Sequence, residues 1–346
     1  MQNRERSSAS ARDSLTSFAL TTASQPRPQF PKPRSKAFSA VLHKVERYAR
    51  DDSITILFEG ESGTGKTWMA RYAHQHSNRS SHVLHEESVA TISDSLAGSD
   101  LFGHVMGAFT DARAHRPGAF QSAVHSTLFL DELGKATPVV QRHLLRAIEE
   151  RVIRPVGSDR SINVDVRLMA ATNVDLKSLV EKELFLPDLY ARLGHFGVLL
   201  PPLRDRREDI PDLARYFLAQ HASRRGYPIG LPTIHPALMA ALEEAEWETN
   251  LRGLDGAIHY LIVEADPAVE LTLDHCTGDF DHLRTHSRGR PTKSSPASVV
   301  AAVKQMGSVA DAARALSVSR STIYRYTAKL KEDLPVPHVA ESSPGD

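Results

Sequence analysis

The feature that most constrains the fold of this chain is a glycine-rich turn at residues 60–67. The turn reads Gly-Glu-Ser-Gly-Thr-Gly-Lys-Thr, and it lies between a short apolar run at 53–58 (SITILF) and a helical pattern at 66–76. Glycines let backbone N–H groups curl around phosphate oxygens at the N-terminus of a helix. The order of strand, turn and helix therefore predicts a phosphate-binding loop of the Walker A type. The alternative is a glycine-rich turn that carries Lys and Thr by chance.

This loop is expected to bind ATP and Mg²⁺. Lys66 should reach the β- and γ-phosphates, and the hydroxyl group of Thr67 should bind Mg²⁺. The residues expected to hold the nucleotide in this loop are Gly60, Glu61, Ser62, Gly63, Thr64, Gly65, Lys66 and Thr67.

A second apolar run further along the chain ends in two carboxylates. Residues 128–132 read LFLDE, so Asp131 and Glu132 follow a buried-strand pattern. Asp131 is expected to hold Mg²⁺ with its water shell, and Glu132 is expected to orient and polarise the attacking water. By itself an acidic pair after a strand could be an ordinary solvated strand end. After a Walker A loop it favours an ATPase.

Strand patterns alternate with helical patterns in the first part of the chain, and in the second part only the helical patterns continue. Further buried-strand patterns occur at 127–130 and 165–171, with a helical pattern at 139–151 between them. This alternation predicts an α/β fold, a parallel sheet with helices on both faces. After the prolines at 201–202 only helical patterns follow, at 210–221, 236–245 and 251–265. They predict a small α-helical lid.

The predicted domains are a disordered basic arm at 1–36, an α/β ATPase subdomain at 37–205, an α-helical lid subdomain at 206–280, a linker at 281–298, a helix-turn-helix at 299–331 and a tail at 332–346. Charge is unevenly distributed along them, although 42 basic and 42 acidic residues cancel overall. Residues 1–50 carry ten basic and three acidic residues, and residues 281–331 carry ten basic and two acidic residues. We therefore expect the protein to bind an anionic polymer through one of the two ends of the chain.

The composition also excludes several classes of protein. A single cysteine, Cys276, cannot form an internal disulfide or a cysteine zinc cluster. No apolar run approaches the roughly 20 residues that a membrane helix needs. We expect a cytoplasmic protein with no membrane partner.

Residues 101–112 read LFGHVMGAFTDA, and this segment resembles the LFGH…GAFTGA signature of the bacterial enhancer-binding proteins. These are AAA+ ATPases that activate sigma-54 RNA polymerase. The resemblance runs through roughly 37–330, with further matches at 170–173 (AATN), 188–193 (DLYARL), 200–210 (LPPLRDRREDI) and 247–252 (WETNLR). It implies an AAA+ fold and dimers that assemble into a hexameric ring.

The resemblance implies contact residues for sigma-54 in the inserted segment. Phe109 and Thr110 would lie on an exposed loop at the hexamer pore and grip sigma-54, supported by a second insertion at 151–162. Small flanking residues suit such a loop. The alternative for Phe109 is a buried aromatic residue at a turn.

The resemblance also implies nucleotide contacts outside the glycine-rich loop. Arg192 would be an arginine finger that reaches the site of a neighbouring subunit, where it would neutralise charge on the transferred phosphoryl group. Arg252 would contact the nucleotide from the lid, and Asn173 would sense the γ-phosphate or position water. The alternative for Arg192 is a surface salt bridge.

Four departures from the family pattern predict a weakened or retuned ATPase. Asp111 stands where the family has the second glycine of its loop, which adds charge and removes conformational freedom. Leu186 stands where an arginine is common, and Ser88 stands in place of a switching asparagine. Glu248 and Thr249 replace a Pro-Gly pair.

Residues 307–325 resemble the Fis-type helix-turn-helix found at the end of this family. The second helix is expected to begin at Ser319 and to enter the major groove of double-stranded DNA by its N-terminal end. Arg320 is the expected base reader, and Arg325 and Lys329 are expected to contact phosphates. The residues expected to bind DNA are Ser319, Arg320, Ser321, Thr322, Arg325 and Lys329. The alternative is a basic, solvated helical hairpin.

The hypothesis is a sigma-54-dependent activator that binds an enhancer and uses ATP hydrolysis in a hexamer to remodel the closed promoter complex. The rival is a DNA-binding regulator that uses nucleotide only to oligomerise, and Asp111, Leu186 and Ser88 motivate it. The GAFT segment and the DNA-reading end disfavour a general unfoldase or replication motor. Because only about 36 arm-like residues precede the ATPase in this sequence, we expect control by a regulator protein in trans or by expression level.

Overall fold

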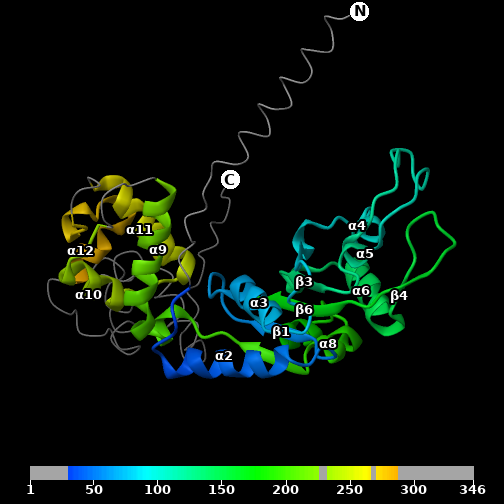
Figure 1. Ribbon diagram of the computed structural model, residues 1–346, viewed down its shortest axis with the longest axis horizontal. Coiled ribbons are helices and arrows are strands. Elements are labelled where there is room, and N and C mark those ends of the chain that lie inside the picture. The colour runs from blue at the N-terminus through cyan, green and yellow to red at the C-terminus, as the bar shows by residue number, and fades with distance from the viewer. Residues whose placement is uncertain (1–29, 226–231, 266–269, 287–346) are drawn as a thin grey trace, which may run out of the picture. The chain divides into compact units, whose positions relative to one another are not determined.

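The computed structural model describes residues 30–225, 232–265 and 270–286. The chain divides into two units, 1–284 and 285–346, and the described residues belong almost entirely to the first. Within that unit a parallel sheet is followed by a group of helices (Figure 1). The predicted helix-turn-helix at 299–331, with all six expected DNA-binding residues, lies outside the described residues, as does most of the predicted arm.

Five parallel strands form the sheet, in the order β2-β3-β6-β1-β7. Their bounds are β1 Ile56–Glu59, β2 His85–Ser88, β3 Thr127–Asp131, β6 Arg167–Thr172 and β7 Phe196–Leu199. The strands β1, β3 and β6 are buried over most of their length, which explains their nearly continuous apolar sequence. The α/β prediction is confirmed.

Strand β1 begins three residues later than the sequence pattern predicts. The carboxylate of Asp51 accepts hydrogen bonds from the backbone N–H and the hydroxyl group of Ser53, at 2.9 and 2.6 Å. The backbone N–H of Ile54 also donates to the carbonyl of Asp51. This turn uses the backbone groups that a strand would need, so the ladder starts at Ile56.

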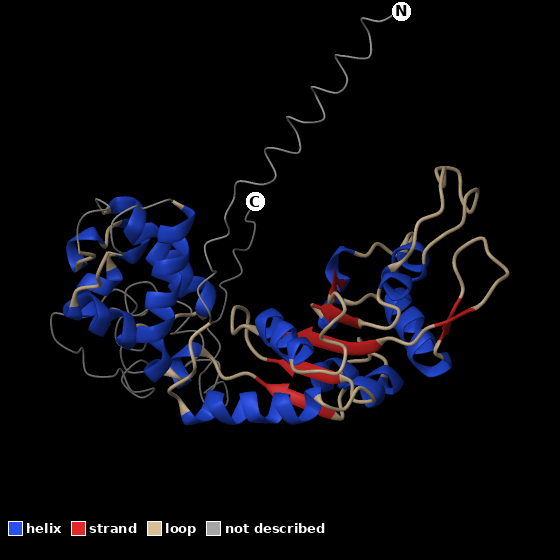
Figure 2. Cartoon of the chain, viewed as in Figure 1, coloured by secondary structure: helices blue, strands red, loops and turns tan. Residues whose placement is uncertain are grey.

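Helices cover both faces of the sheet (Figure 2). The helices of this α/β subdomain are α2 Lys36–Ala49, α3 Lys66–Gln75, α4 Ala97–Phe102, α5 Ala119–Ser122, α6 Pro138–Glu150, α7 Leu176–Glu181 and α8 Pro187–Leu193. Successive strand residues point to opposite faces. Phe58 and Phe129 therefore pack with α2 and α3, whereas Leu57 and Leu128 pack in the core formed with α4 to α8.

Two insertions lie next to each other beyond the sheet. The first runs from Gly103 to Arg116, and the second contains the antiparallel pair β4 Val152–Ile153 and β5 Ile162–Asn163. Val156 joins them, because its N–H donates to the carbonyl of Gly103 at 2.8 Å and its carbonyl accepts from Val105 at 3.1 Å. The two loops extend in the same direction in Figure 1.

The lid consists of α9 Ile210–Arg224, α10 Pro236–Glu244, α11 Leu251–Glu264 and α12 His282–His286. Its core is a separate apolar cluster that includes Leu213, Leu242 and Ile258. No strand of the described residues follows β7, as the sequence pattern predicts.

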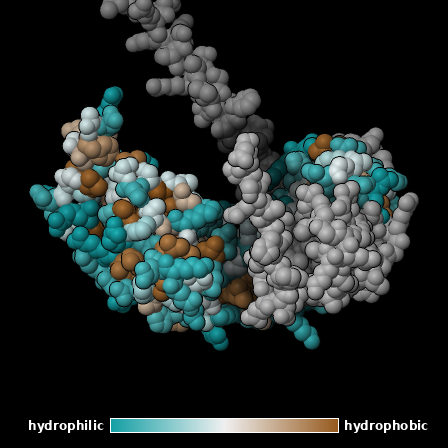
Figure 3. Space-filling model, turned by 180° about the vertical axis from the view of Figure 1, so that it is seen from behind, coloured by the Kyte–Doolittle hydropathy of each residue, from teal (hydrophilic) through white to brown (hydrophobic). Residues whose placement is uncertain are grey.

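Large apolar side chains are scattered on the surface of the described residues. Those most exposed include Val83, Met106, Leu184 and Leu199. On the face shown in Figure 3 apolar residues alternate with polar ones over the α/β subdomain, which is ordinary for a protein surface. Among the described helices, none has the length and apolar character required to cross a membrane.

Candidate nucleotide-binding site

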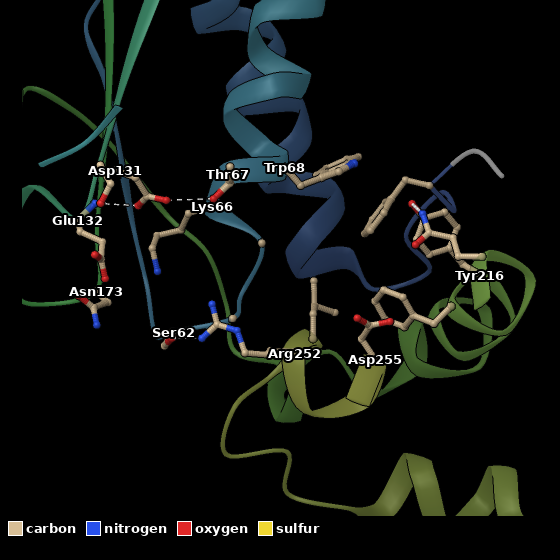
Figure 4. Close-up of a pocket in the computed structure, with 17 residues that line it drawn as sticks. Ser62, Lys66, Thr67, Trp68, Asp131, Glu132, Asn173, Tyr216, Arg252 and Asp255 are labelled. Atoms are coloured by element: carbon tan, nitrogen blue, oxygen red, sulfur yellow. Dashed lines mark hydrogen bonds between the residues drawn. The ribbon is translucent and has the colours of Figure 1, made fainter. Parts of the chain in front are cut away.

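A pocket of about 540 Å³ lies between the α/β subdomain and the lid. Its walls come from the N-terminal end of α3, from the carboxyl ends of β2 and β3, from the residues that follow β3 and β6, and from the lid helices α9 and α11 (Figure 4). The predicted site residues that line it are Ser62, Gly63, Gly65, Lys66, Thr67, Asp131, Glu132, Asn173 and Arg252. Residues scattered over almost 200 positions of the sequence thus share one pocket.

The glycine-rich loop has the backbone conformation that only glycine accepts easily. Gly63 and Gly65 have φ angles of +78° and +103°. A Cβ atom on Gly63 would lie 2.1 Å from the carbonyl oxygen of Thr249 in the lid, so any other residue would push the lid away from the loop. The loop therefore needs glycine at 63 both for its own turn and for lid contact.

Lys66 is oriented by the loop in which it lies. Its ammonium group donates to the backbone carbonyls of Gly60 and Glu61, at 2.8 and 2.9 Å. Burial lowers the pKa of Lys66, and the nearby carboxylate of Asp131 opposes that effect. The arrangement places a cation at the N-terminal end of α3, which suits phosphate.

Asp131 and Thr67 form the pair of oxygen donors that Mg²⁺ would need. The hydroxyl group of Thr67 donates to Oδ2 of Asp131 at 3.1 Å, and the N–H of Glu132 donates to Oδ1 at 2.8 Å. Among the described residues no group of three or more His, Cys, Asp or Glu side chains could hold a metal ion. A hydroxyl and one carboxylate fit Mg²⁺, which keeps several of its waters and is completed by substrate phosphates.

The residues that follow neighbouring strands meet at this edge of the sheet. Ser88 lies opposite Asp131 in the register of β2 and β3, and both line the pocket with Glu132 and Asn173. Glu132 has a φ angle of +57° and forms an ion pair with Lys135 at 2.6 Å. Its side chain lies in the pocket on the same side as Asn173 (Figure 4).

The lid is attached directly to the glycine-rich loop. Asn250 is fully buried; its amide N–H₂ donates to the carbonyl of Ser62 at 2.9 Å, and its amide oxygen accepts from the N–H of Leu203 at 2.7 Å. Arg252 donates to the hydroxyl group of Ser62 at 3.1 Å, and the buried Arg206 donates to the carbonyl of Thr64 at 2.8 Å. The lid angle is therefore tied to the loop that would hold phosphates.

Two family models match the chain in succession. The model described as the sigma-54 interaction domain matches residues 32–198, and the AAA+ ATPase lid domain matches residues 204–293. This chain belongs to the sigma-54 interaction domain family.

Among the relatives of this family, the transcriptional regulatory protein ZraR of Klebsiella oxytoca is 45% identical over 229 residues, which cover 66% of this chain and 51% of that protein. The formate hydrogenlyase transcriptional activator FhlA of Escherichia coli K12 is 44% identical over 230 residues, or 66% of this chain and 33% of that protein. The chain thus spans between a third and a half of these relatives. The crystal structure of Brucella abortus NtrX in complex with ATP superposes with a TM-score of 0.66 at 25% identity, over 94% of this chain and 73% of that one.

The sigma-54 interaction domain of this chain presents Phe109 at the tip of its first insertion. The Phe109 side chain is 38% exposed and packs edge-on against His104, with ring centroids 4.9 Å apart. Thr110 is exposed beside it. Phe109 is therefore not the buried aromatic residue that was the alternative.

The turn around Phe109 accommodates Asp111 without strain. Its backbone is closed by hydrogen bonds from Gly107 to Ala112 and from Ala112 to Phe109, at 2.8 and 2.9 Å. Gly107 has a φ angle of +80°, whereas Asp111 is not among the residues with positive φ. The glycine that this turn requires is present, so the change at 111 alters the charge of the loop rather than its backbone.

Four of the residues predicted to bind the nucleotide or to act in its hydrolysis do not line the pocket. Gly60, Glu61 and Thr64 belong to the glycine-rich loop but face other residues, and Glu61 pairs with Arg204 at 2.6 Å. Arg192 lies on α8, where its 58% exposed side chain contacts Glu149 at 3.4 Å. Within one chain Arg192 makes the surface ion pair that was its alternative, so its role as a finger remains a prediction about a second chain.

The sequence patterns missed the opposite end of the pocket. It is lined by Phe30, Trp68, Tyr216, Phe217, Gln220, Leu251 and Asp255. Trp68 lies directly after Lys66 and Thr67 in the sequence and could have been found from that position. Phe30 and Tyr216 carry no local signal, because what brings them together is the packing of the lid.

Proposed function

We propose that this protein is a sigma-54-dependent transcriptional activator. It would bind enhancer DNA as dimers, assemble into a hexamer, and use ATP hydrolysis to remodel the closed complex of sigma-54 RNA polymerase. The observation that carries the proposal is the pocket in which Lys66, Asp131 and Glu132 lie together, within a match to the sigma-54 interaction domain. We also propose that a separate regulator protein controls this activator in trans.

The residues of the pocket support a mechanism for hydrolysis. Mg²⁺ held through Thr67 and Asp131 would neutralise charge on the phosphates. Lys66 would bind the β- and γ-phosphate oxygens, and Glu132 would orient water and accept its proton. Asn173, at the same edge, would position the water or contact the γ-phosphate, while Arg252 would contact the nucleotide from the lid.

A continuous path leads from this pocket to Phe109. Ser88 ends β2 in the pocket, and the chain continues through the short helix Val89–Thr91 and α4 to the insertion that carries Phe109. The helical turn Leu133–Lys135, which follows Glu132, contacts Val89–Thr91, and the hydroxyl group of Thr137 donates to Asp94. A shift of Glu132 on hydrolysis would reach the insertion through these contacts.

Replacing Phe109 by alanine should separate ATP hydrolysis from sigma-54 binding. Phe109 is exposed at a loop tip, remote from the pocket, so the variant should hydrolyse ATP at the wild-type rate within about twofold. Its affinity for sigma-54 in the presence of ADP and aluminium fluoride should fall by about 10-fold or more, as for an aromatic anchor at an interface. Binding is measured with labelled sigma-54 by anisotropy.

The matched control is Val83→Ala, because Val83 is a 74% exposed apolar residue elsewhere on the same subdomain. It should leave both activities unchanged. If the wild-type protein hydrolyses ATP but never binds sigma-54 under these conditions, the sigma-54 proposal fails. The regulator that uses nucleotide only to oligomerise would then account for the sequence better.

A further inference from the structure

Helix α2 has an exposed side that lies outside the nucleotide pocket, along the border of the α/β subdomain (Figure 1, blue). Its apolar side packs with α3 and β7 and includes the buried residues Phe38, Val45 and Ala49. On the opposite side, the spacing i, i+4, i+7, i+11 and i+14 places five exposed residues in one line along the helix. These residues, which we call the basic stripe, are Lys36, Ala40, His43, Arg47 and Arg50.

The basic stripe carries positive charge that no neighbouring carboxylate neutralises. Among the residues that the structure describes, no Asp or Glu side chain forms an ion pair with Lys36, Arg47 or Arg50. The one acidic residue of α2 is Glu46, and its carboxylate accepts a hydrogen bond from the hydroxyl group of Tyr72 on α3. The charges of the stripe are therefore available to a ligand.

The stability of the helix does not account for this arrangement of charge. Positive charge near the C-terminal end of a helix is favourable, which accounts for Arg47 and Arg50. Lys36 is the first residue of α2, and at that end the helix dipole disfavours a positive charge. The first turn also contains no acidic residue that would offset it. A ligand with negative charges along the whole stripe explains the cations at both ends.

The composition of the stripe fits a phosphate backbone better than a protein or a membrane. Protein interfaces have apolar or aromatic residues at their centre, whereas the centre of the stripe holds Ala40 and His43. A membrane surface would need the apolar side of the helix, which is buried against the sheet. The stripe contains no Phe, Tyr or Trp ring on which the bases of a single strand would stack. Lys36 and Arg50 are about 21 Å apart along the helix, a length over which duplex DNA carries about 12 phosphate charges.

We propose that the basic stripe of α2 is a second DNA-binding surface, which binds the phosphate backbone of duplex DNA through Lys36, Arg47 and Arg50. In the proposed function the ATPase subdomain binds nucleotide and sigma-54 and another part of the chain binds DNA, so this role is additional to it. Phosphate contacts carry no base information, and the stripe therefore strengthens DNA binding without adding sequence specificity. Duplex DNA bound through the stripe is held against the subdomain that carries the nucleotide pocket.

The test removes three positive charges from the full chain. With a labelled random-sequence duplex of about 40 base pairs, Lys36→Gln/Arg47→Gln/Arg50→Gln should decrease the slope of log Kd against log salt concentration by about 2 to 3, because each phosphate contact contributes about 0.9. The Kd at about 0.1 M salt should rise by about 10-fold or more. Lys36→Arg/Arg47→Lys/Arg50→Lys keeps the charges and should bind the duplex like the wild type. Binding is measured by anisotropy.

The matched control removes the same charge from the other face of the sheet. Arg142→Gln/Lys177→Gln/Lys182→Gln replaces exposed residues on or next to α6 and α7, which pack on the face opposite α2. This variant should change neither the slope nor the Kd. All three variants should unfold within about 3 °C of the wild type, because every replaced side chain is exposed.

The outcomes separate the second DNA surface from the proposed function. A triple glutamine variant of α2 that keeps the wild-type slope and affinity overturns the DNA surface and leaves the proposed function intact. So does an equal loss of affinity in the charge-matched control, or a variant that loses affinity for polyglutamate but not for the duplex. If the wild type opens no sigma-54 promoter while the α2 variant shows the expected loss of duplex binding, the proposed function fails and the DNA surface is supported.

Discussion

Glu132→Gln should lower the rate of ATP hydrolysis by about 10²- to 10⁴-fold while the affinity for ATP changes little. Glutamine has the size of glutamate but cannot accept the proton of the attacking water. The positive φ angle of Glu132 and its place in the pocket beside Asp131 are the observations behind this expectation. Turnover is measured by phosphate release, and affinity is measured by titration with ATP.

The control for this prediction is Glu150→Gln. Glu150 lies at the end of α6 and pairs with Arg146 on the surface, so its loss should leave turnover within about twofold of the wild type. The Glu132 variant also loses its ion pair with Lys135, which is exposed and contributes little to stability. Retention of more than a tenth of wild-type turnover by Glu132→Gln would contradict the assigned role of Glu132.

Arg192→Ala should lower ATP turnover by about 10³-fold or more, because a finger supplied by a neighbouring subunit stabilises the charge of the transition state. In the single chain Arg192 points to Glu149 and not into the pocket, so it can act only after assembly. Mixing Arg192→Ala with Glu132→Gln should restore turnover. If the protein assembles into rings as proposed, the intact Arg192 of one variant would enter the intact site of the other. Turnover is followed across mixing ratios.

A control variant and a contradicting outcome make this prediction testable. Glu149→Ala removes the surface partner of Arg192 and should leave turnover nearly unchanged, since an exposed ion pair contributes little. If mixing restores no turnover although the two variants assemble together, Arg192 acts within its own chain or as a surface residue only. The finger role would then be wrong.

The parts of the fold that the sequence predicts are those with strong local signals. Strands β3 and β6 are apolar because both faces are buried, and α3 is marked by the glycine-rich loop before it. Strand β2 reads His-Glu-Glu-Ser and lies at the edge of the sheet, where polar residues are tolerated, so no apolar pattern reveals it. Strand β7 at the other edge was missed for a related reason, because its four residues include a glycine and an exposed leucine.

The same distinction applies to the pocket. Its phosphate end comes from motifs that are contiguous in the sequence, such as 60–67 and 131–132, and these could be predicted. Its aromatic end is assembled from Phe30, Trp68 and Tyr216, and neither Phe30 nor Tyr216 belongs to a recognised motif. The attachment of the lid through Asn250 was also hidden, because its partners Ser62 and Leu203 are distant in sequence. Tertiary contacts between segments that are remote in the sequence produce no periodic pattern of residues from which they could be predicted.

We propose that this chain converts ATP hydrolysis into opening of a sigma-54 promoter. The most direct test is permanganate footprinting of promoter DNA with purified sigma-54 RNA polymerase, this protein and nucleotide. We expect reactive thymines around the start site with ATP, and none with a non-hydrolysable analogue or with Glu132→Gln. A wild-type protein that hydrolyses ATP at full rate in this mixture while the promoter stays closed would contradict it.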